Sequence, residues 1–121
     1  MLRTTCFAAA LAVLPLAAAA QSGSFVGQSD HDASGSVEIV TEDGAQYIVF
    51  GEDFRLDRAP DPQVALGRDG YDAATLAGEL DRRRGGQRYR VPDGIDAADY
   101  DQVWIWCVRF DVPLALAELA E

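Results

Sequence analysis

The cysteine at position 107 carries the most direct chemistry in this sequence. A thiolate can act as a nucleophile, bind a metal or be oxidised, and Cys107 lies within the densest aromatic run of the chain, Val-Trp-Ile-Trp-Cys-Val-Arg-Phe. The chain has one other cysteine, Cys6, and one histidine, His31. One cysteine and one histidine are too few for a closed zinc site. With a carboxylate, Cys107 and His31 could hold copper or iron if the fold brought them together.

The run around Cys107 is expected to be a β-strand over residues 102–110 because it is rich in β-branched and aromatic residues. Side chains alternate between the two faces of a strand. One predicted face, expected to be core, carries Trp104, Trp106, Val108 and Phe110. The other carries Val103, Ile105, Cys107 and Arg109. It is also apolar as far as Arg109, so the strand is expected to be central and covered on both sides.

Two interpretations of Cys107 remain open at this point. Arg109 would share its face and could stabilise a thiolate, which would make Cys107 a redox thiol. Alternatively, Cys107 is a small buried hydrophobic residue, as free cysteines often are. Sequence separation does not decide whether His31 meets the thiol.

The first twenty residues have the pattern of a secretory signal peptide. Arg3 provides the basic start, residues 6–16 are apolar, and Ala18-x-Ala20 resembles a cleavage site. The apolar run is shorter than the roughly 20 residues that span a bilayer. We therefore expect a signal peptide at 1–20 and one mature domain at 21–121, periplasmic or secreted and without a membrane span. Cleavage would discard Cys6 and leave Cys107 as the only thiol.

The composition is strongly acidic. Twenty Asp and Glu face ten basic residues, all arginine, and the net charge is −10. Such a charge repels nucleic acid, so we expect no nucleic-acid partner. The run Arg82–Arg84 is expected to neutralise nearby carboxylates.

The mature segment has the pattern of short strands separated by Gly, Pro and Asp. Residues 36–41 and 45–50 flank Asp43-Gly44 and predict a hairpin. Residues 62–66 predict an edge strand because Pro62 lacks an N–H. Residues 87–91 predict another strand, 112–119 a strand or short helix, and 71–84 are ambiguous. The expected fold is all-β, an antiparallel sandwich or barrel-like single domain.

Catalytic motifs are scarce in this sequence. It contains no Gly-x-Ser-x-Gly elbow, no Cys-x-x-Cys, no His-Glu-x-x-His and no phosphate loop. An electron-transfer or binding domain is therefore favoured over a stand-alone enzyme.

Two segments carry a resemblance to a known family. They are Gly85-x-Gln-x-Tyr-x-Val-Pro92 and Ile105-Trp-Cys-x-x-Phe-x-Val112, and further matches include Phe25, His31 and Asp53-Phe54. With them, nearly all of residues 21–121 resembles the DM-thirteen, or electron-transfer DM-thirteen, domain. The sequence departs from the family pattern at Pro62, where an aliphatic residue is more frequent, and at Leu114-Ala115, which replaces Phe-Gly.

This resemblance implies an extracytoplasmic all-β domain whose single cysteine takes part in redox chemistry. Carried onto this sequence, that role falls on Cys107, and His31 matches the family's N-terminal histidine. Animal relatives join the domain to haem-binding and cytochrome modules. None is visible in this sequence, so we expect a separate, unknown redox partner protein. The rival hypothesis is a non-catalytic β-domain that binds a protein or ligand and uses Cys107 only for packing.

Overall fold

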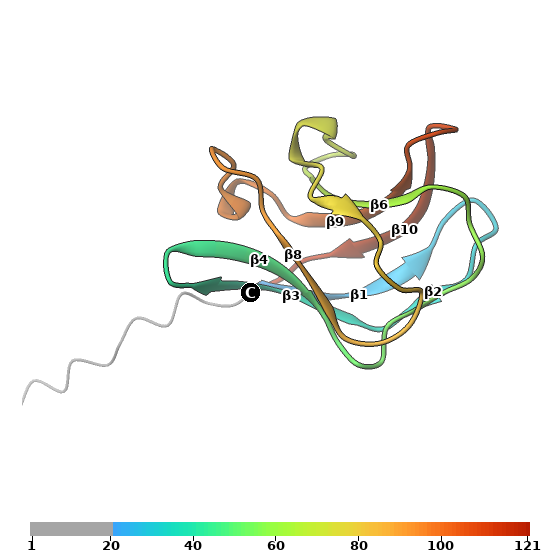
Figure 1. Ribbon diagram of the computed structural model, residues 1–121, viewed down its shortest axis with the longest axis horizontal. Coiled ribbons are helices and arrows are strands. Elements are labelled where there is room, and N and C mark those ends of the chain that lie inside the picture. The colour runs from blue at the N-terminus through green and yellow to red at the C-terminus, as the bar shows by residue number, and fades with distance from the viewer. Residues whose placement is uncertain (1–20) are drawn as a thin grey trace, which may run out of the picture.

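The computed structural model describes residues 21–121, and the predicted signal peptide lies outside them. Eight antiparallel strands form one nearly closed, barrel-like sheet in the order β7-β6-β9-β10-β1-β3-β4-β8, and β2 pairs with β5 separately (Figure 1). The predicted all-β, barrel-like fold is confirmed. The strand bounds are β1 Ser22–Gly27, β2 Ala33–Ser34, β3 Ser36–Glu42, β4 Ala45–Phe50, β5 Arg55–Leu56, β6 Pro62–Gly67, β7 Gly78–Glu79, β8 Gln87–Arg90, β9 Gln102–Cys107 and β10 Val112–Glu118.

Strand β1 joins the two halves of the barrel. Its first residues, Ser22–Ser24, pair with β3, and its last, Phe25–Gly27, pair with β10. On one side, β3 and β4 form the hairpin that the sequence predicts, and Asp43 and Gly44 adopt positive φ at its turn. Such angles match the twist of a two-residue hairpin and are why Asp-Gly marks these turns.

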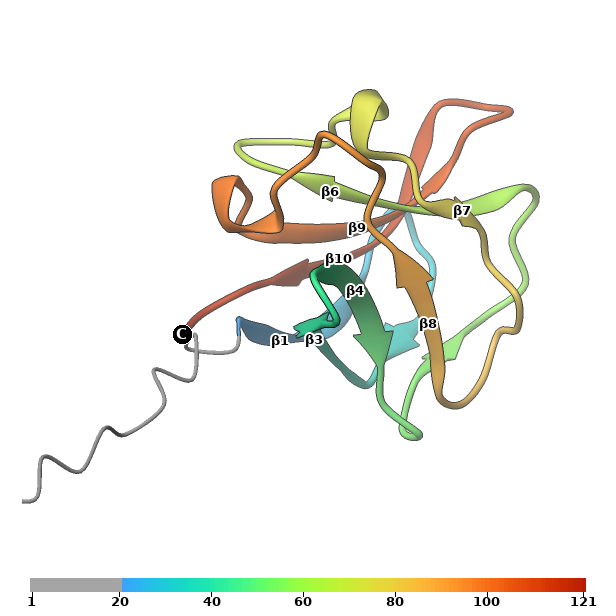
Figure 2. The same cartoon turned by 60° about the vertical axis from the view of Figure 1, so that its left-hand side comes forward.

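The two outermost strands of the sheet, β7 and β8, approach each other where the barrel would close (Figure 2). Side chains from β8 fill this seam. The Gln87 amide donates to the carbonyls of Arg82 and Gly85 and accepts from the Arg82 N–H. The Tyr89 hydroxyl accepts from the Asp81 N–H at 2.9 Å and donates to Gln87. The Gln-x-Tyr segment therefore closes the barrel through side chains where β7 and β8 do not pair.

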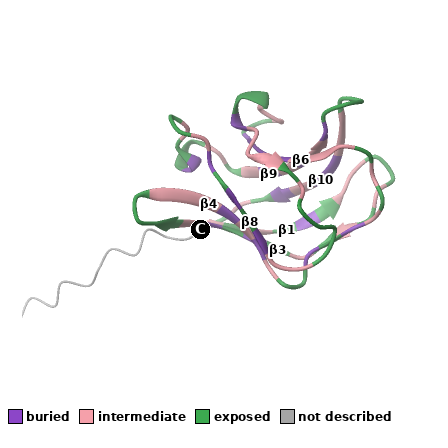
Figure 3. Cartoon of the chain, in the orientation of Figure 1, coloured by how far each residue is buried: buried purple, intermediate pink, exposed green. Residues whose placement is uncertain are grey.

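The core lies inside the barrel and is built from alternate residues of the strands (Figure 3). Four aromatic rings meet in its centre: Phe25, Phe50, Phe54 and Tyr89. The centroid separations in this group are 4.6–5.3 Å, within the range of favourable aromatic contacts. Gly35 makes room for this cluster, because a Cβ there would lie 2.7 Å from the Phe54 backbone nitrogen.

Strand β9 is central, between β6 and β10, as predicted, but it is not covered on both sides, and the predicted core face is the outer one. Val103, Ile105 and Cys107 are buried in the core, whereas Trp104 and Trp106 are only half-buried on the outer face. Each indole N–H has a polar partner there, Gln102 for Trp104 and Asp111 for Trp106. The interior of a small barrel is narrow, and aliphatic side chains fill it without leaving an indole N–H unpaired.

The prediction that β9 reaches Phe110 is also wrong. The strand ends at Cys107, and residues 108–111 form an exposed turn into β10, with Phe110 61% exposed. Arg109 therefore lies in this turn, where its guanidinium is 5.8 Å from the Phe110 ring centroid. The strand alternation that placed Arg109 on the face of Cys107 does not extend to it.

Two further elements differ from expectation or resolve an ambiguity. Strand β6 is not an edge strand, because β7 covers its outer side. Pro62 is tolerated there as the first residue of its strand. Residues 71–84 form neither a long helix nor a long strand: they contain a single 3-10 turn, Ala73–Thr75, and the two-residue β7. A second 3-10 turn, Ala97–Asp99, precedes β9.

Candidate functional site

Cys107 lies at the end of β9, on the inner face of the barrel. Its exposed fraction is 1%, and it is the free cysteine of the described residues. It faces Pro62 of β6 on one side and Val112 of β10 on the other. Both are the last register positions of their ladders. Beyond them, the one backbone bond between the turn and the residues before β6 joins the Val108 N–H to the Asp61 carbonyl, at 3.4 Å.

His31 is held beside the same end of the barrel by Asp57. Its Nδ1–H donates to Asp57 Oδ1 at 2.8 Å, because an ionised carboxylate can only accept. The other carboxylate oxygen accepts from the Asp32 N–H at 2.9 Å. These bonds hold the pKa of Asp57 below its ordinary value, with the Asp32 backbone contributing most and His31 and Arg83 contributing less.

Gly27 is the residue that allows this placement. A Cβ at position 27 would lie 2.7 Å from the His31 carbonyl carbon and closer still to its oxygen. Only glycine therefore lets the loop after β1 fold back so closely. The Asp57 N–H also donates to the Asp32 carbonyl at 3.0 Å, which ties this loop to the segment after β5.

The strand pairing brings Cys107 and His31 to one end of the barrel. Gly27, at the end of β1, faces Ala115 of β10, and the start of β10 faces Cys107. The hydrogen-bonding partner of the His31 ring is Asp57, however, and not the thiol. Residues 21–121 contain no group of three or more His, Cys, Asp or Glu side chains that could hold a metal ion.

An aromatic cluster covers the outer side of β9 next to Cys107. Tyr71 stacks on Trp106 with a centroid separation of 4.3 Å and an interplanar angle of 7°, and Trp104 meets Trp106 edge-on at 5.6 Å. The sequence does not predict this cluster, because the tryptophan face is assigned to the core. Tyr71 also lies in an irregular segment, for which no face can be predicted. Cys107 is therefore the inward neighbour of a partly exposed aromatic surface.

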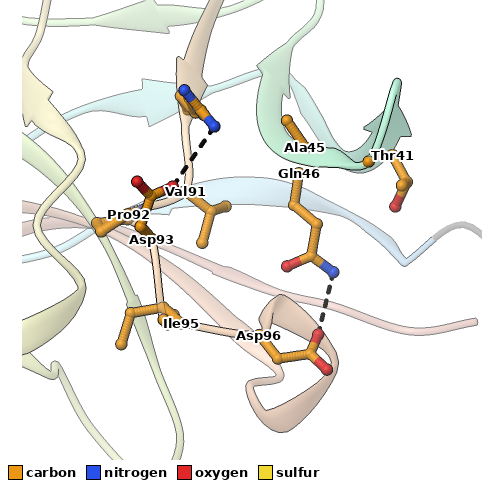
Figure 4. A pocket seen from close by; sticks show the side chains of 11 residues that line it. Thr41, Ala45, Gln46, Val91, Pro92, Asp93, Ile95 and Asp96 are labelled. Atoms are coloured by element: carbon orange, nitrogen blue, oxygen red, sulfur yellow. Dashed lines mark hydrogen bonds and ion pairs between the residues drawn. The ribbon is translucent and has the colours of Figure 1, made fainter.

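A separate hollow lies between the β3–β4 turn and residues 90–96, with a volume of about 290 Å³ (Figure 4). Four of its polar side chains bond with each other or with the backbone. The Gln46 amide donates to Asp96 at 3.0 Å and accepts from the Ala97 N–H, and Arg90 pairs with Asp93. Gln46 thus fastens the loop before β9, and this hollow includes neither the thiol nor the histidine.

No helix within residues 21–121 is long and apolar enough to cross a membrane.

A nearly closed all-β barrel with one buried thiol at its end defines a single-cysteine β-domain. The family model described as Electron transfer DM13 matches residues 24–119, and the chain therefore belongs to this family. No curated protein and no solved structure matches the chain. The membership gives a redox-related role at the level of the family.

Proposed function

We propose that this chain is an exported redox or electron-transfer accessory domain in which Cys107 is the reacting group. The family membership supports the redox role, and the pattern of residues 1–20 supports export to the periplasm or cell exterior. The observation that carries the assignment to Cys107 is its place at the terminal register of two ladders.

This placement matters because the thiol is buried and must be uncovered to react. Ends of strands open at a lower free energy than whole domains do. After Cys107 the strand gives way to the exposed turn 108–111. The hydrogen bond from the Val108 N–H to the Asp61 carbonyl, at 3.4 Å, is long. Opening of this end exposes the sulfur while the Phe25 cluster and the β3–β4 hairpin stay folded.

The proposed chemistry is thiol–disulfide exchange with a partner protein. The Cys107 thiol loses its proton to solvent, and its sulfur attacks one sulfur of the partner's disulfide. That disulfide breaks, and the second partner sulfur leaves as a thiolate and takes up a proton. Reaction with a peroxide instead gives a sulfenic acid at Cys107 and reduces the peroxide. Neither route requires Arg109. Arg109 would stabilise the thiolate only if opening of the turn brought its guanidinium close to the sulfur.

A direct test measures the accessibility of the thiol in the folded protein. The full chain carrying Cys6→Ser leaves Cys107 as its one thiol. It is treated with a chromogenic disulfide reagent with and without urea, and its copper and iron content is measured. Cys107→Ala in the same background is the matched control. We expect modification in the absence of urea, at a rate below that of the unfolded chain, and a sulfenic acid after exposure to peroxide.

The burial of Cys107 also favours a second candidate, a binding domain in which the thiol only packs. Modification confined to the unfolded chain, together with no bound copper or iron, would establish this second function. A metal that is present and is lost in Cys107→Ala would instead make the cysteine a ligand, with His31 its candidate co-ligand.

A further inference from the structure

A hollow of about 550 Å³ lies beside His31, at the same end of the barrel as Cys107. Its lining is unusual for so acidic a chain, because three arginines contribute to it: Arg55, Arg83 and Arg84. Arg83 also lines an adjoining hollow together with Arg58. Two segments far apart in sequence, 55–58 and 83–84, therefore contribute four arginines to the lining of these two adjoining hollows. The backbone bond from the Leu56 N–H to the Arg83 carbonyl, at 2.9 Å, fixes the two segments side by side.

None of these four arginines forms a direct ion pair with a carboxylate in the part of the chain that the structure describes. Within residues 21–121 the ion pairs are His31–Asp57, Arg88–Glu42 and Arg90–Asp93, and none includes Arg55, Arg58, Arg83 or Arg84. The expectation that the run 82–84 neutralises nearby carboxylates holds for Arg83, which helps to lower the pKa of Asp57 without forming an ion pair with it. The chain has twice as many acidic as basic residues, so the lack of pairing does not follow from a shortage of carboxylates.

One of the two acidic residues of the hollow, Asp57, is already engaged. The two Asp57 oxygens accept from His31 and from the Asp32 N–H. The other acidic residue in the lining is Asp32, so the three arginines outnumber the carboxylates. His31 uses Nδ1 for Asp57, and its Nε2 makes no hydrogen bond with any other residue of 21–121. The hollow therefore presents unused donors to a ligand.

We propose that this arginine-lined hollow binds a small molecule that bears a phosphate or carboxylate group. Guanidinium groups pair with both oxyanions through two parallel N–H bonds. The volume of about 550 Å³ falls within the range of small-molecule sites, about 300–1,000 Å³. Because the whole chain is negative, anions are repelled from the rest of its surface, and a local excess of arginine is needed to hold one. The site is independent of any reaction at Cys107.

The test measures binding of inorganic phosphate and of succinate to the full chain by calorimetry at low ionic strength. Arg83→Gln and Arg55→Gln each remove one guanidinium from the hollow. Arg68→Gln is the matched control. Arg68 follows the last residue of β6, at the end of that strand away from Pro62, and its guanidinium donates to the Asp99 carbonyl. Thermal melts verify that the variants fold. Their backbones keep the bonds that join 55–56 to 83–84.

We expect saturable binding of at least one probe, weakened about tenfold by each hollow variant and unchanged by Arg68→Gln. Binding of phosphate alone assigns a phosphate-bearing ligand, and binding of succinate alone assigns a carboxylate-bearing one. The proposal fails if neither probe saturates the protein, or if Arg68→Gln weakens binding as much as Arg83→Gln does. In the second case the attraction would depend on overall charge and not on this hollow.

Discussion

Pro62 faces Cys107 at the last register position of the β6–β9 ladder. On its other side the Pro62 carbonyl accepts the Leu80 N–H at 2.8 Å, but proline has no N–H to return to Leu80. Residues 62 and 80 therefore form one backbone hydrogen bond where an antiparallel pair could form two, at the end of the barrel where the thiol lies. This is also a position where the chain departs from the aliphatic residue that the resemblance to its family leads us to expect.

The substitution Pro62→Val should protect the thiol. The introduced valine would supply the missing N–H to the Leu80 carbonyl, and a net hydrogen bond contributes about 1 kcal/mol. We expect modification of Cys107 in the folded chain to slow about fivefold as a result. The rate in urea serves as the control and should not change. An unchanged rate in the folded chain would mean that the thiol becomes exposed by another opening.

Substitution of Cys107 itself should distinguish a dry site from a hydrated one. Cys107→Ala removes the sulfur from a position 1% exposed and should lower the free energy of unfolding by about 1–2 kcal/mol. Cys107→Ser keeps the size but buries a hydroxyl among apolar neighbours, so we expect a larger loss, about 2–3 kcal/mol. Urea unfolding provides both values. A serine variant as stable as the parent would indicate that water already reaches the site.

Asp57→Asn should alter the acid limb of the stability profile. The folded-state pKa of Asp57 is lowered, so its contribution is present above the unfolded-state pKa of about 3.9 and is lost as the pH falls through the folded-state value. The variant should be less stable than the parent at pH 6, by less than about 1 kcal/mol because the side chain is exposed. The difference should vanish near pH 2. Asp93→Asn, at a 95% exposed side chain, is the control in urea titrations.

Tyr89 should control the alkaline limb. Burial raises the pKa of Tyr89 to about 12 from 10.0. A raised folded-state pKa means that the contribution is complete below pH 10 and is lost as the pH rises towards 12. The loss amounts to roughly 2–3 kcal/mol. Tyr89→Phe should remove this alkaline loss and the highest tyrosinate step in absorbance at 295 nm. It should also cost about 1–2 kcal/mol at neutral pH, because the Asp81 N–H loses its acceptor.

Local patterns predict those parts of the fold that local chemistry determines. The hairpin around Asp43-Gly44 follows from its turn residues and flanking alternation, and residues 87–91 and 112–119 contain strands close to the expected bounds. Strand β1 has no such signal, because Ser22–Gly27 is poor in apolar residues. Its stability comes from its two neighbours, β3 and β10, and these pairings are not local in sequence.

The individual residues of the candidate site can be predicted from the sequence, but their arrangement cannot. Cys107 and His31 stand out as a thiol in an aromatic strand and as the one histidine of the chain, and the fold brings both to one end of the barrel. The partner of His31 is Asp57, 26 residues away, and no spacing motif indicates such a pair. The alternation along β9 is predicted correctly, but hydrophobicity alone assigns the wrong face to the core. Tryptophan has a large apolar ring system, yet its indole N–H needs a hydrogen-bond partner.

The pairing of β1 with β10 has a consequence for biosynthesis. Ser22 and Ala120 exchange backbone hydrogen bonds at 2.8 and 3.0 Å, and β1 is the strand that joins both halves of the barrel. A ribosome delivers β1 before the other strands of the sheet and β10 after them. The barrel therefore cannot close while these strands are still being made, and closure must wait until the residues of β10 emerge. Until then β1 has a partner on one side only, and the last strand to be made completes the sheet.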